Sequence, residues 1–274
     1  MPSAIRLVHI HHNGFLAHLS GPGGNRSLLF DYPGDEHLPG EIRPLAEALL
    51  REETRGRDLA VFLSHSHADH CNPRLPDLVA DAAETAWVLS DDVPDMMPEL
   101  AGRILDRFGP ASLLVAEPDE QYEHQGMAVS TLMSNDLGLA FDIGVAGLRV
   151  YFGGDLALWD WPGARPQDSE FTRRFYGEAL ERIAEQGPVD LAFSNTDPRL
   201  DNLSGGPEFV DRVRPALFAP MHVFGRTDTL LEVRERTAGS GSEVFLYQGC
   251  GDGAEYLLDG GRAVLVSETK GERP

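Results

Sequence analysis

The segment HSHADH, from His65 to His70, places four potential metal ligands within six residues. It follows an apolar run, so we expect it in the turn that ends a buried strand. Side chains alternate in direction along a strand and spread outward around a tight turn. His65 and His67 can therefore face one point, and Asp69 and His70 another point close by. Imidazole nitrogens and a carboxylate suit zinc, iron or manganese. The segment therefore predicts one or two divalent metal ions, about 3.5 to 4 Å apart when there are two, of the kind that generates hydroxide near neutral pH.

Such a site needs ligands from elsewhere in the chain, and two residues are candidates. His222 follows the apolar run FAPM and precedes a turn, at the kind of strand end that presents functional side chains. Asp155 follows Gly153 and Gly154, whose lack of side chains lets backbone approach a site closely. A carboxylate at this point can bridge two cations. An aspartate that merely caps a turn is the alternative interpretation of Asp155.

Composition limits the classes of partner. The chain has 23 Lys and Arg residues against 44 Asp and Glu residues, and its net charge of −21 repels polyanions. The sequence has no apolar run of membrane-spanning length and no signal peptide pattern, and Cys71 and Cys250 make neither a disulfide framework nor a metal-type pair. We therefore expect a cytoplasmic enzyme with a small-molecule substrate and without a nucleic acid or membrane partner. The composition is also compatible with a homo-oligomer.

The order of elements indicates an α/β fold made of two similar halves. Short β-type runs at 4–10, 14–19 and 27–32 precede a helical stretch at 44–53 and an apolar strand at 59–64. A further helix is expected at 75–83, after the ligand turn. A second group of strands is followed by further helices and strands. The strands of this second half are expected at 127–133, 139–143, 148–152, 191–194, 217–220 and 244–247, and its helices at 169–185, 207–213 and 228–237. This order predicts two sheets packed face to face with helices outside.

Three motifs in this order resemble the metallo-β-lactamase superfamily: HSHADH, a strand ending in GGD at 153–155, and a strand ending in PMH at 220–222. The resemblance covers nearly the whole chain. It implies a single domain over 1–274, folded as a four-layer αββα sandwich of two mixed β-sheets flanked by helices. The segments SNDLG, GDLALWDW and DPRL, which begin at 134, 154 and 197, further resemble the branch of ascorbate 6-phosphate lactonase-like proteins.

The resemblance also implies roles for individual residues. His65 and His67 would bind the first metal ion, and Asp155 would bridge the two ions. The second ion would take Asp69, His70 and His222. Asp31, at the end of an early strand, would support the ligand loop through hydrogen bonds.

One departure from the superfamily pattern concerns the first metal ion. Most hydrolases of this superfamily supply a further histidine where this chain has Ser134, Asn135 and Asp136. Asp136 is a candidate substitute, and an oxygen ligand would favour manganese or iron over zinc. The other interpretation is a site with a single ion. Zinc remains the metal expected first.

The predicted chemistry is hydrolysis by a metal-activated hydroxide. Asp69 is the candidate to orient this hydroxide and to move its proton, in addition to acting as a ligand. Four residues are candidates for binding substrate or for shaping its pocket: His12, Trp159, Asp197 and Arg199. Arg199 offers a bidentate fork to a carboxylate or phosphate, although an internal ion pair with Asp197 explains both residues equally well.

Three functions remain open from the sequence. The first is a hydrolase of small cyclic esters, such as lactones, or of phosphorylated metabolites. The second is a phosphodiesterase or nuclease of the same superfamily, which the net charge disfavours. The third is a redox or non-catalytic descendant with a variant metal site, which the change at 134–136 favours.

Overall fold

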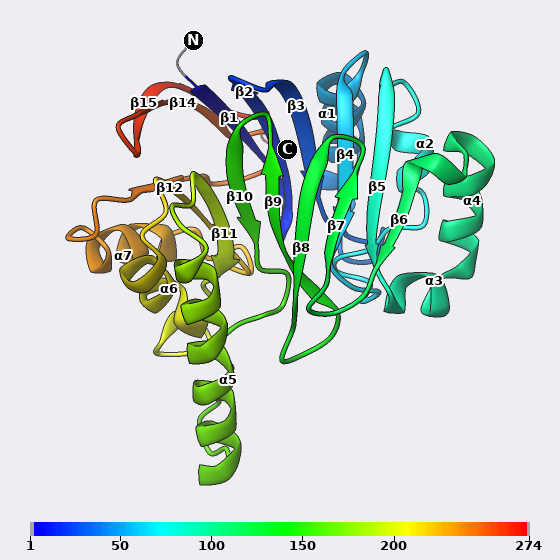
Figure 1. Cartoon of the computed structure of the whole chain (residues 1–274). Coiled ribbons are helices and arrows are strands. Elements are labelled where there is room, and N and C mark those ends of the chain that lie inside the picture. The colour runs from blue at the N-terminus through cyan, green and yellow to red at the C-terminus, as the bar shows by residue number, and fades with distance from the viewer. Residues whose placement is uncertain (1–2, 273–274) are drawn as a thin grey trace.

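Two β-sheets stack face to face in the computed structural model, which describes residues 3–272 (Figure 1). Within these residues, the first sheet runs in the order β15 (Arg262–Thr269), β14 (Gly253–Asp259), β1 (Ser3–His11), β2 (Gly14–Gly21), β3 (Gly24–Phe30), β4 (Asp58–Leu63), β5 (Glu84–Ser90), β6 (Leu113–Ala116). The second runs in the order β13 (Glu243–Val244), β12 (Leu217–Met221), β11 (Leu191–Asn195), β10 (Leu148–Phe152), β9 (Leu139–Val145), β8 (Met127–Met133), β7 (Gln121–His124).

Both sheets are mixed. Strands β1, β2 and β3 pair antiparallel, whereas β3, β4, β5 and β6 pair parallel. In the second sheet, β7 to β10 pair antiparallel and β10 to β13 pair parallel. The parallel strands of each sheet therefore end at a common edge, where the loops that follow them can meet.

Helices cover the outer face of each sheet (Figure 1). The first group follows β3, β4 and β5 in the chain and consists of α1 (Ile42–Thr54), α2 (Leu75–Leu78), α3 (Asp92–Met96) and α4 (Pro98–Phe108). The second group consists of α5 (Pro166–Glu185), α6 (Gly206–Val213) and α7 (Thr229–Arg236). Short 3-10 helices span Pro110–Ser112 and Leu203–Gly205. Among the described residues, no helix is both long enough and apolar enough to cross a bilayer.

The apolar run of β4 shows why the layers form. Ala60 and Phe62 belong to the core between the two sheets, while Leu59, Val61 and Leu63 belong to the core beneath the first helices. A strand whose two faces are both covered must be apolar at every position, and β4 is buried from Leu59 onward. A third core lies between the second sheet and α5, α6 and α7. The predicted four-layer arrangement is confirmed.

Two local predictions differ from the structure. The helix expected over 75–83 ends at Leu78, because the backbone beyond it hydrogen-bonds instead to the segment that leads into β4, through Gly56 N to Asp81 O and Ala83 N to Arg57 O. The ribbon of β14 and β15 was not anticipated, although its turn at Gly260 and Gly261 carries a hairpin signal.

Candidate metal centre

The candidate ligands gather at one edge of the two sheets, in loops that follow strands. The segment 65–70 follows β4, Asp155 follows β10 and His222 follows β12. His12 and Asn13 form the turn between β1 and β2. Residues that are more than 200 positions apart in sequence meet in this way. The backbone N–H of His222, for example, donates a hydrogen bond to Asn13 Oδ1.

The first group of donors consists of His65, His67 and Asp155, each of which offers an atom within 4.8 Å of the others. His65 Nε2 lies 3.0 Å from His67 Nδ1 and 3.5 Å from Asp155 Oδ2. His65 is buried, whereas His67 is exposed. This group is therefore open to solvent on the side of His67.

The second group consists of His12, Asp69, His70 and His222. His70 Nε2 lies 3.3 Å from His222 Nε2, and Asp69 Oδ2 lies 3.4 Å from His12 Nε2 and 3.8 Å from His70 Nε2. Histidines and one carboxylate at such separations match the donor set expected of zinc, iron or manganese. Sequence reasoning placed His12 with the substrate, whereas the structure places its ring among these donors.

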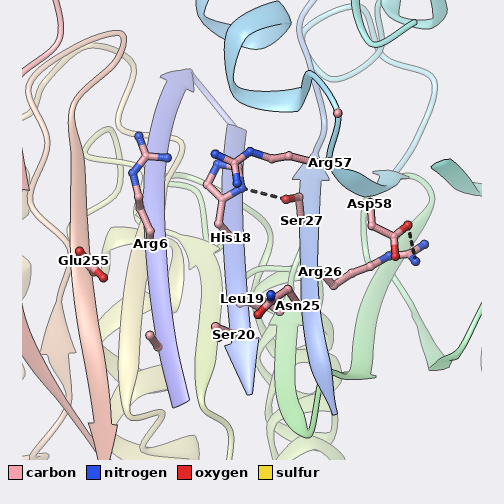
Figure 2. Close-up of a pocket in the computed structure, with 12 residues that line it drawn as sticks. Arg6, His18, Leu19, Ser20, Asn25, Arg26, Ser27, Arg57, Asp58 and Glu255 are labelled. Atoms are coloured by element: carbon pink, nitrogen blue, oxygen red, sulfur yellow. Dashed lines mark hydrogen bonds and ion pairs between the residues drawn. The ribbon is translucent and has the colours of Figure 1, made fainter. Parts of the chain in front are cut away.

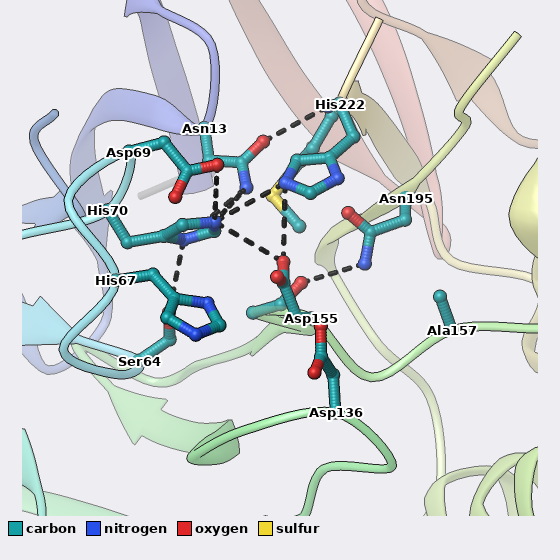
Figure 3. Close-up of polar contacts among 12 residues, drawn as sticks. Asn13, Ser64, His67, Asp69, His70, Asp136, Asp155, Ala157, Asn195 and His222 are labelled. Carbon is teal, nitrogen blue, oxygen red and sulfur yellow. Dashed lines mark hydrogen bonds and ion pairs between the residues drawn. The ribbon is translucent and has the colours of Figure 1, made fainter. Parts of the chain in front are cut away.

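Asp155 belongs to the first group and also contacts His70 and His222 of the second (Figure 3). Its Oδ2 faces His65, while its Oδ1 lies 3.2 Å from His222 Nε2 and 3.3 Å from His70 Nε2. One carboxylate oxygen thus faces each group, which is the arrangement that a bridging ligand requires.

Asp31 supports this centre from behind. Its Oδ2 accepts a hydrogen bond from His70 Nδ1 at 2.6 Å, and its two oxygens also accept from the backbone N–H and the hydroxyl of Ser64, both at 2.8 Å. A histidine that donates from Nδ1 keeps Nε2 free as a ligand atom. The structure therefore places Asp31 where the resemblance put it, behind the ligand loop.

Burial keeps the imidazoles in their neutral form. It lowers the pKa of His65 and of His70 to about 3, with a further contribution from neighbouring histidines, and it lowers the pKa of His222 well below its usual value. Burial alone would raise the pKa of Asp69, but the neighbouring His12 ring, with Nε2 3.4 Å away, and the field of His70 lower it below its usual value. Neutral imidazoles and an ionised carboxylate are the forms that bind metal.

The pKa of Asp155 is shifted in the opposite direction from that of Asp69. Burial raises its pKa well above the usual value, and the nearby carboxylates of Asp136, Asp69, Asp31 and Asp197 raise it further. Three buried atoms of the donor residues also have no hydrogen-bond partner, namely Asp155 Oδ1, His222 Nδ1 and His12 Nε2. Polar atoms buried in this way are costly unless something satisfies them. A bound cation would offset the repulsion and complete the coordination of Asp155 and His12, so the residues fit a divalent metal ion.

Four of the ten non-glycine residues with positive φ angles in the described part of the chain lie around the donor groups. His12, Asp31, His222 and Phe224 all have positive φ angles, of 52°, 43°, 57° and 47°. This region is unfavourable for residues other than glycine, and such residues cluster at functional sites. The strain orients the ligand side chains at the strand ends.

A glycine permits the close approach of the Asp155 loop. Gly154 has φ of 49°, and a Cβ atom there would lie 2.7 Å from Leu139 O and from Ser64 Cβ. A side chain at this position would push Asp155 away from the ligand turn that begins after Ser64. This confirms the role that the sequence predicted for Gly154.

The two donor groups open into a cavity of about 440 Å³, which we call the site cavity. Besides the donors His67, Asp69, Asp155 and His222, its walls are Asn135, Asp136, Trp159, Trp161, Arg199 and Phe224. Trp159 lines the cavity as predicted, and its indole N–H donates to the backbone oxygen of Asp155 at 2.9 Å. Trp159 thus also holds the loop that carries the bridging carboxylate.

Arg199 and Asp197 divide two roles between them. Asp197 is fully buried and accepts hydrogen bonds from Arg199 Nε at 2.8 and 2.9 Å. Arg199 is half-exposed, and its guanidinium carbon lies 4.0 Å from the centre of the Phe224 ring and 5.3 Å from that of Trp161. Asp197 therefore orients Arg199, and only Arg199 is among the residues that line the cavity.

Asp136 is exposed and lies in the cavity wall near Asp155 (Figure 3). It belongs to neither donor group among the described residues. The first group therefore has three donors in this structure, and Asp136 lines the cavity without being one of them.

The structure adds two residues that sequence reasoning missed. Asn13 is buried, with Nδ2 at 3.2 Å from His70 Nε2 and Oδ1 accepting from His222 N at 3.0 Å. Asn195, at the end of β11, donates to the backbone oxygen of Gly154 at 2.8 Å. A polar residue at the end of an apolar strand was the available signal for Asn195, as it was for Asp155 and His222.

A second hollow lies at the opposite ends of β2, β3 and β4 (Figure 2). Its arginines already have partners, because Arg26 lies 3.0 Å from Asp58 and Arg6 pairs with Glu53 at 2.6 Å. These paired charges stabilise the sheet end, and we do not place the substrate there.

No protein family model matches this chain, and neither does any curated protein. Solved structures do match. The metallo-β-lactamase fold protein YhfI from Bacillus subtilis aligns with a TM-score of 0.54 at 15% identity, over 92% of this chain and 99% of that one. CmlA, a diiron β-hydroxylase from Streptomyces venezuelae, aligns with a TM-score of 0.51 at 16% identity, over 94% of this chain and 54% of that one. This chain therefore has the metallo-β-lactamase fold, and it corresponds to about half of CmlA.

Proposed function

We propose that this protein is a metal-dependent hydrolase of small cyclic esters, such as lactones, or of phosphorylated metabolites. The observation that carries the proposal is the position of Asp155, whose Oδ2 faces His65 of one donor group and whose Oδ1 faces His70 and His222 of the other. Its ion-pair contacts are all with imidazoles that burial keeps uncharged. A buried carboxylate in such surroundings is explained by a cation bound from outside the chain.

The donor sets define which residues would hold the metal ions. His65, His67 and Asp155 would hold one, and Asp69, His70, His222 and Asp155 the other, with His12 as an additional donor beside Asp69. Bound divalent ions would supply a water nucleophile that ionises near neutral pH and a Lewis acid for the substrate oxygen.

The chain's own residues would do the rest. Asp69 is half-buried, with one oxygen on His12 and a wall position in the site cavity, so it can orient the attacking water and hold its proton. Asp31 fixes the tautomer of His70 through the hydrogen bond at Nδ1. Trp159 lines the cavity and holds the backbone of Asp155 through its indole N–H.

Arg199 is the group that would select the substrate. Its guanidinium stands at the cavity wall, stacked on Phe224 and oriented by Asp197. A planar cation that is fixed in this way can donate two parallel hydrogen bonds to a carboxylate or phosphate. The net charge of −21 opposes long polyanions, so a small anionic metabolite fits better than a nucleic acid.

The test is a substrate screen on protein reconstituted separately with zinc, manganese and iron. The screen would contain lactones, phosphate monoesters and bis(p-nitrophenyl) phosphate. We expect turnover of a lactone or monoester that a chelator abolishes and added metal restores. Cleavage of the diester alone would favour the phosphodiesterase alternative, and no turnover of any compound by metal-loaded protein would contradict the proposal.

A second candidate function is an oxygen-activating iron enzyme. The first donor group, with two histidines and one carboxylate, is the donor set found in many non-haem iron oxygenases. The likeness to CmlA, a diiron β-hydroxylase, is consistent with this candidate at the level of the fold. Selective retention of iron over zinc during purification, with oxygen consumption on addition of a reductant, would favour it over hydrolysis.

A further inference from the structure

A further cavity adjoins the metal centre and shares Asp69 and Phe224 with the site cavity. It has a volume of about 460 Å³ and lies between the turn after β1, the start of α1, the loop after β12 and the loop after β13. We call it the histidine chamber, because His9, His11, His12 and His37 line it. Its size is within the range of small-molecule sites.

The chamber shares two walls with the site cavity. Asp69 and Phe224 line both, and His12, which belongs to the second donor group, lines the chamber. The ring of Phe224 lies 4.8 Å from that of His12 and 5.2 Å from that of His222, edge to face in each case. A molecule whose reacting group lies at the donors therefore has space in both cavities.

The two spaces differ in charge. The site cavity contains Arg199, Asp136 and Asp155, whereas the residues that line the chamber include Asp69 as their one carboxylate and neither lysine nor arginine. The remaining surface is largely apolar, with contributions from Ile42, Val223 and Tyr247.

The chamber's buried histidine, His9, does not alter this character. Burial lowers the pKa of His9 to about 3, so its ring is neutral at physiological pH. His9 is fixed as a wall by its hydrogen-bond contact with the Gly249 oxygen at 3.1 Å and by stacking on Tyr247 at 3.9 Å. An uncharged ligand group loses no ion hydration on entering such a space, whereas an ionised group would.

We propose that the histidine chamber binds an uncharged alkyl or aryl group of the substrate, while Arg199 in the wall of the site cavity binds its anionic group. This rests on the proposed function and narrows it: the substrate is an amphiphilic ester or lactone whose scissile carbonyl lies between an apolar substituent and a carboxylate or phosphate. A substrate without the apolar group would leave the chamber to water and bind more weakly.

The first experiment measures binding without turnover. N-phenyl-1-naphthylamine, a neutral aromatic probe, would be titrated into the protein and excited at wavelengths that tryptophan does not absorb. Ile42→Trp narrows the chamber, whereas Leu45→Trp, on the same helix and also partly buried, is the matched control because Leu45 does not line it. Thermal unfolding of both variants would verify that they fold.

We expect saturable binding to the wild type, a loss of affinity of about tenfold or more in Ile42→Trp, and little change in Leu45→Trp. Absence of saturable binding to the wild type would overturn the chamber as an apolar site. Equal affinity in Ile42→Trp and the wild type would do the same, as would an equal loss in both variants.

The second experiment uses the metal-loaded protein and p-nitrophenyl esters from acetate to octanoate. We expect kcat/KM to rise with chain length in the wild type and in Leu45→Trp, and Ile42→Trp to lose this rise. A length preference that is unchanged in Ile42→Trp would contradict the assignment. Probe binding that depends on Ile42, together with no hydrolysis of any ester or of the lactone screen, would refute the proposed function and leave the apolar site standing.

Discussion

Glu53 and Asp155 are two largely buried carboxylates at different ends of the same fold, and their surroundings are opposite. Glu53, with 12% of its side chain exposed, receives both Nη atoms of Arg6 at 2.6 and 2.7 Å and lies 3.1 Å from His18 Nε2. Asp155, with 6% exposed, contacts neutral histidines and is surrounded by further carboxylates. The chain supplies the counter-charge in the first case and does not supply it in the second.

The pKa values follow this difference. Burial would raise the pKa of Glu53, but hydrogen bonds from Arg6 and His18 outweigh burial and hold it well below its usual value. For Asp155, burial and its neighbours act in the same direction, upward. A carboxylate that the fold neutralises stabilises the fold, whereas one that it leaves without a cation indicates a ligand site.

The largest expected effect comes from Asp155→Asn, which keeps the shape and removes the charge. We expect metal affinity and hydrolysis to fall by more than about 100-fold, because a bridging ligand is lost from both donor groups. The unfolding free energy of the metal-free variant should equal or exceed that of the metal-free wild type, since a buried charge without a counter-ion has been removed. Denaturant unfolding in the presence of chelator measures this, and a marked destabilisation of the metal-free variant would contradict the comparison.

Glu53→Gln should give the reverse outcome. We expect a loss of about 1 to 3 kcal/mol in unfolding free energy at neutral pH, with metal content and turnover unchanged. Glu52→Gln, at an exposed position on the same helix, is the matched control.

The pH dependence of the Glu53→Gln effect has a definite sign. The pKa of Glu53 is lowered in the folded state, so its contribution is complete above the unfolded value of 4.5 and is lost as the pH falls below it toward the folded value. The stability gap between wild type and variant should therefore shrink in acid. A gap that stays constant from neutral pH to well below pH 4.5 in urea titrations would refute the proposed charge pairing.

Arg199→Lys should have the smallest effect. Asp197 would keep a cationic neighbour, but the planar fork at the cavity wall would be lost. We expect KM for carboxylate or phosphate substrates to rise about two- to tenfold, which corresponds to one hydrogen bond of about 0.5 to 1.5 kcal/mol, with kcat nearly unchanged. Arg226→Lys is the control, and an equal rise in KM for uncharged substrates would show that Arg199 does not recognise the anion.

The sequence predicted the layers of the fold because its strongest signals are local. The apolar run of β4 and the alternating strands of the two halves specify buried strands without knowledge of their partners. The ribbon of β14 and β15 was missed because β15 is exposed along most of its length, so burial imposes little pattern on it. Helix α2 was overestimated because its end is set by hydrogen bonds to a distant segment.

The candidate site was predictable to a similar degree. HSHADH, Asp155 and His222 are recognisable because strand ends and glycines mark them. The place of His12 among the donors, and of Asn13 between His70 and the backbone of His222, depends on how the turn after β1 meets the loop after β12. This contact joins segments that are about 209 residues apart in the chain, and no local sequence pattern predicts it.

The most direct test of the central claim is the metal content of the wild type and of Asp155→Asn, measured by elemental mass spectrometry. Both proteins would be prepared without affinity tag or chelator and then reconstituted with zinc, manganese or iron. We expect one or two equivalents of metal per chain in the wild type and a clear loss of metal in the variant. Wild-type protein that retains no metal, or a variant with the same stoichiometry and affinity, would contradict it.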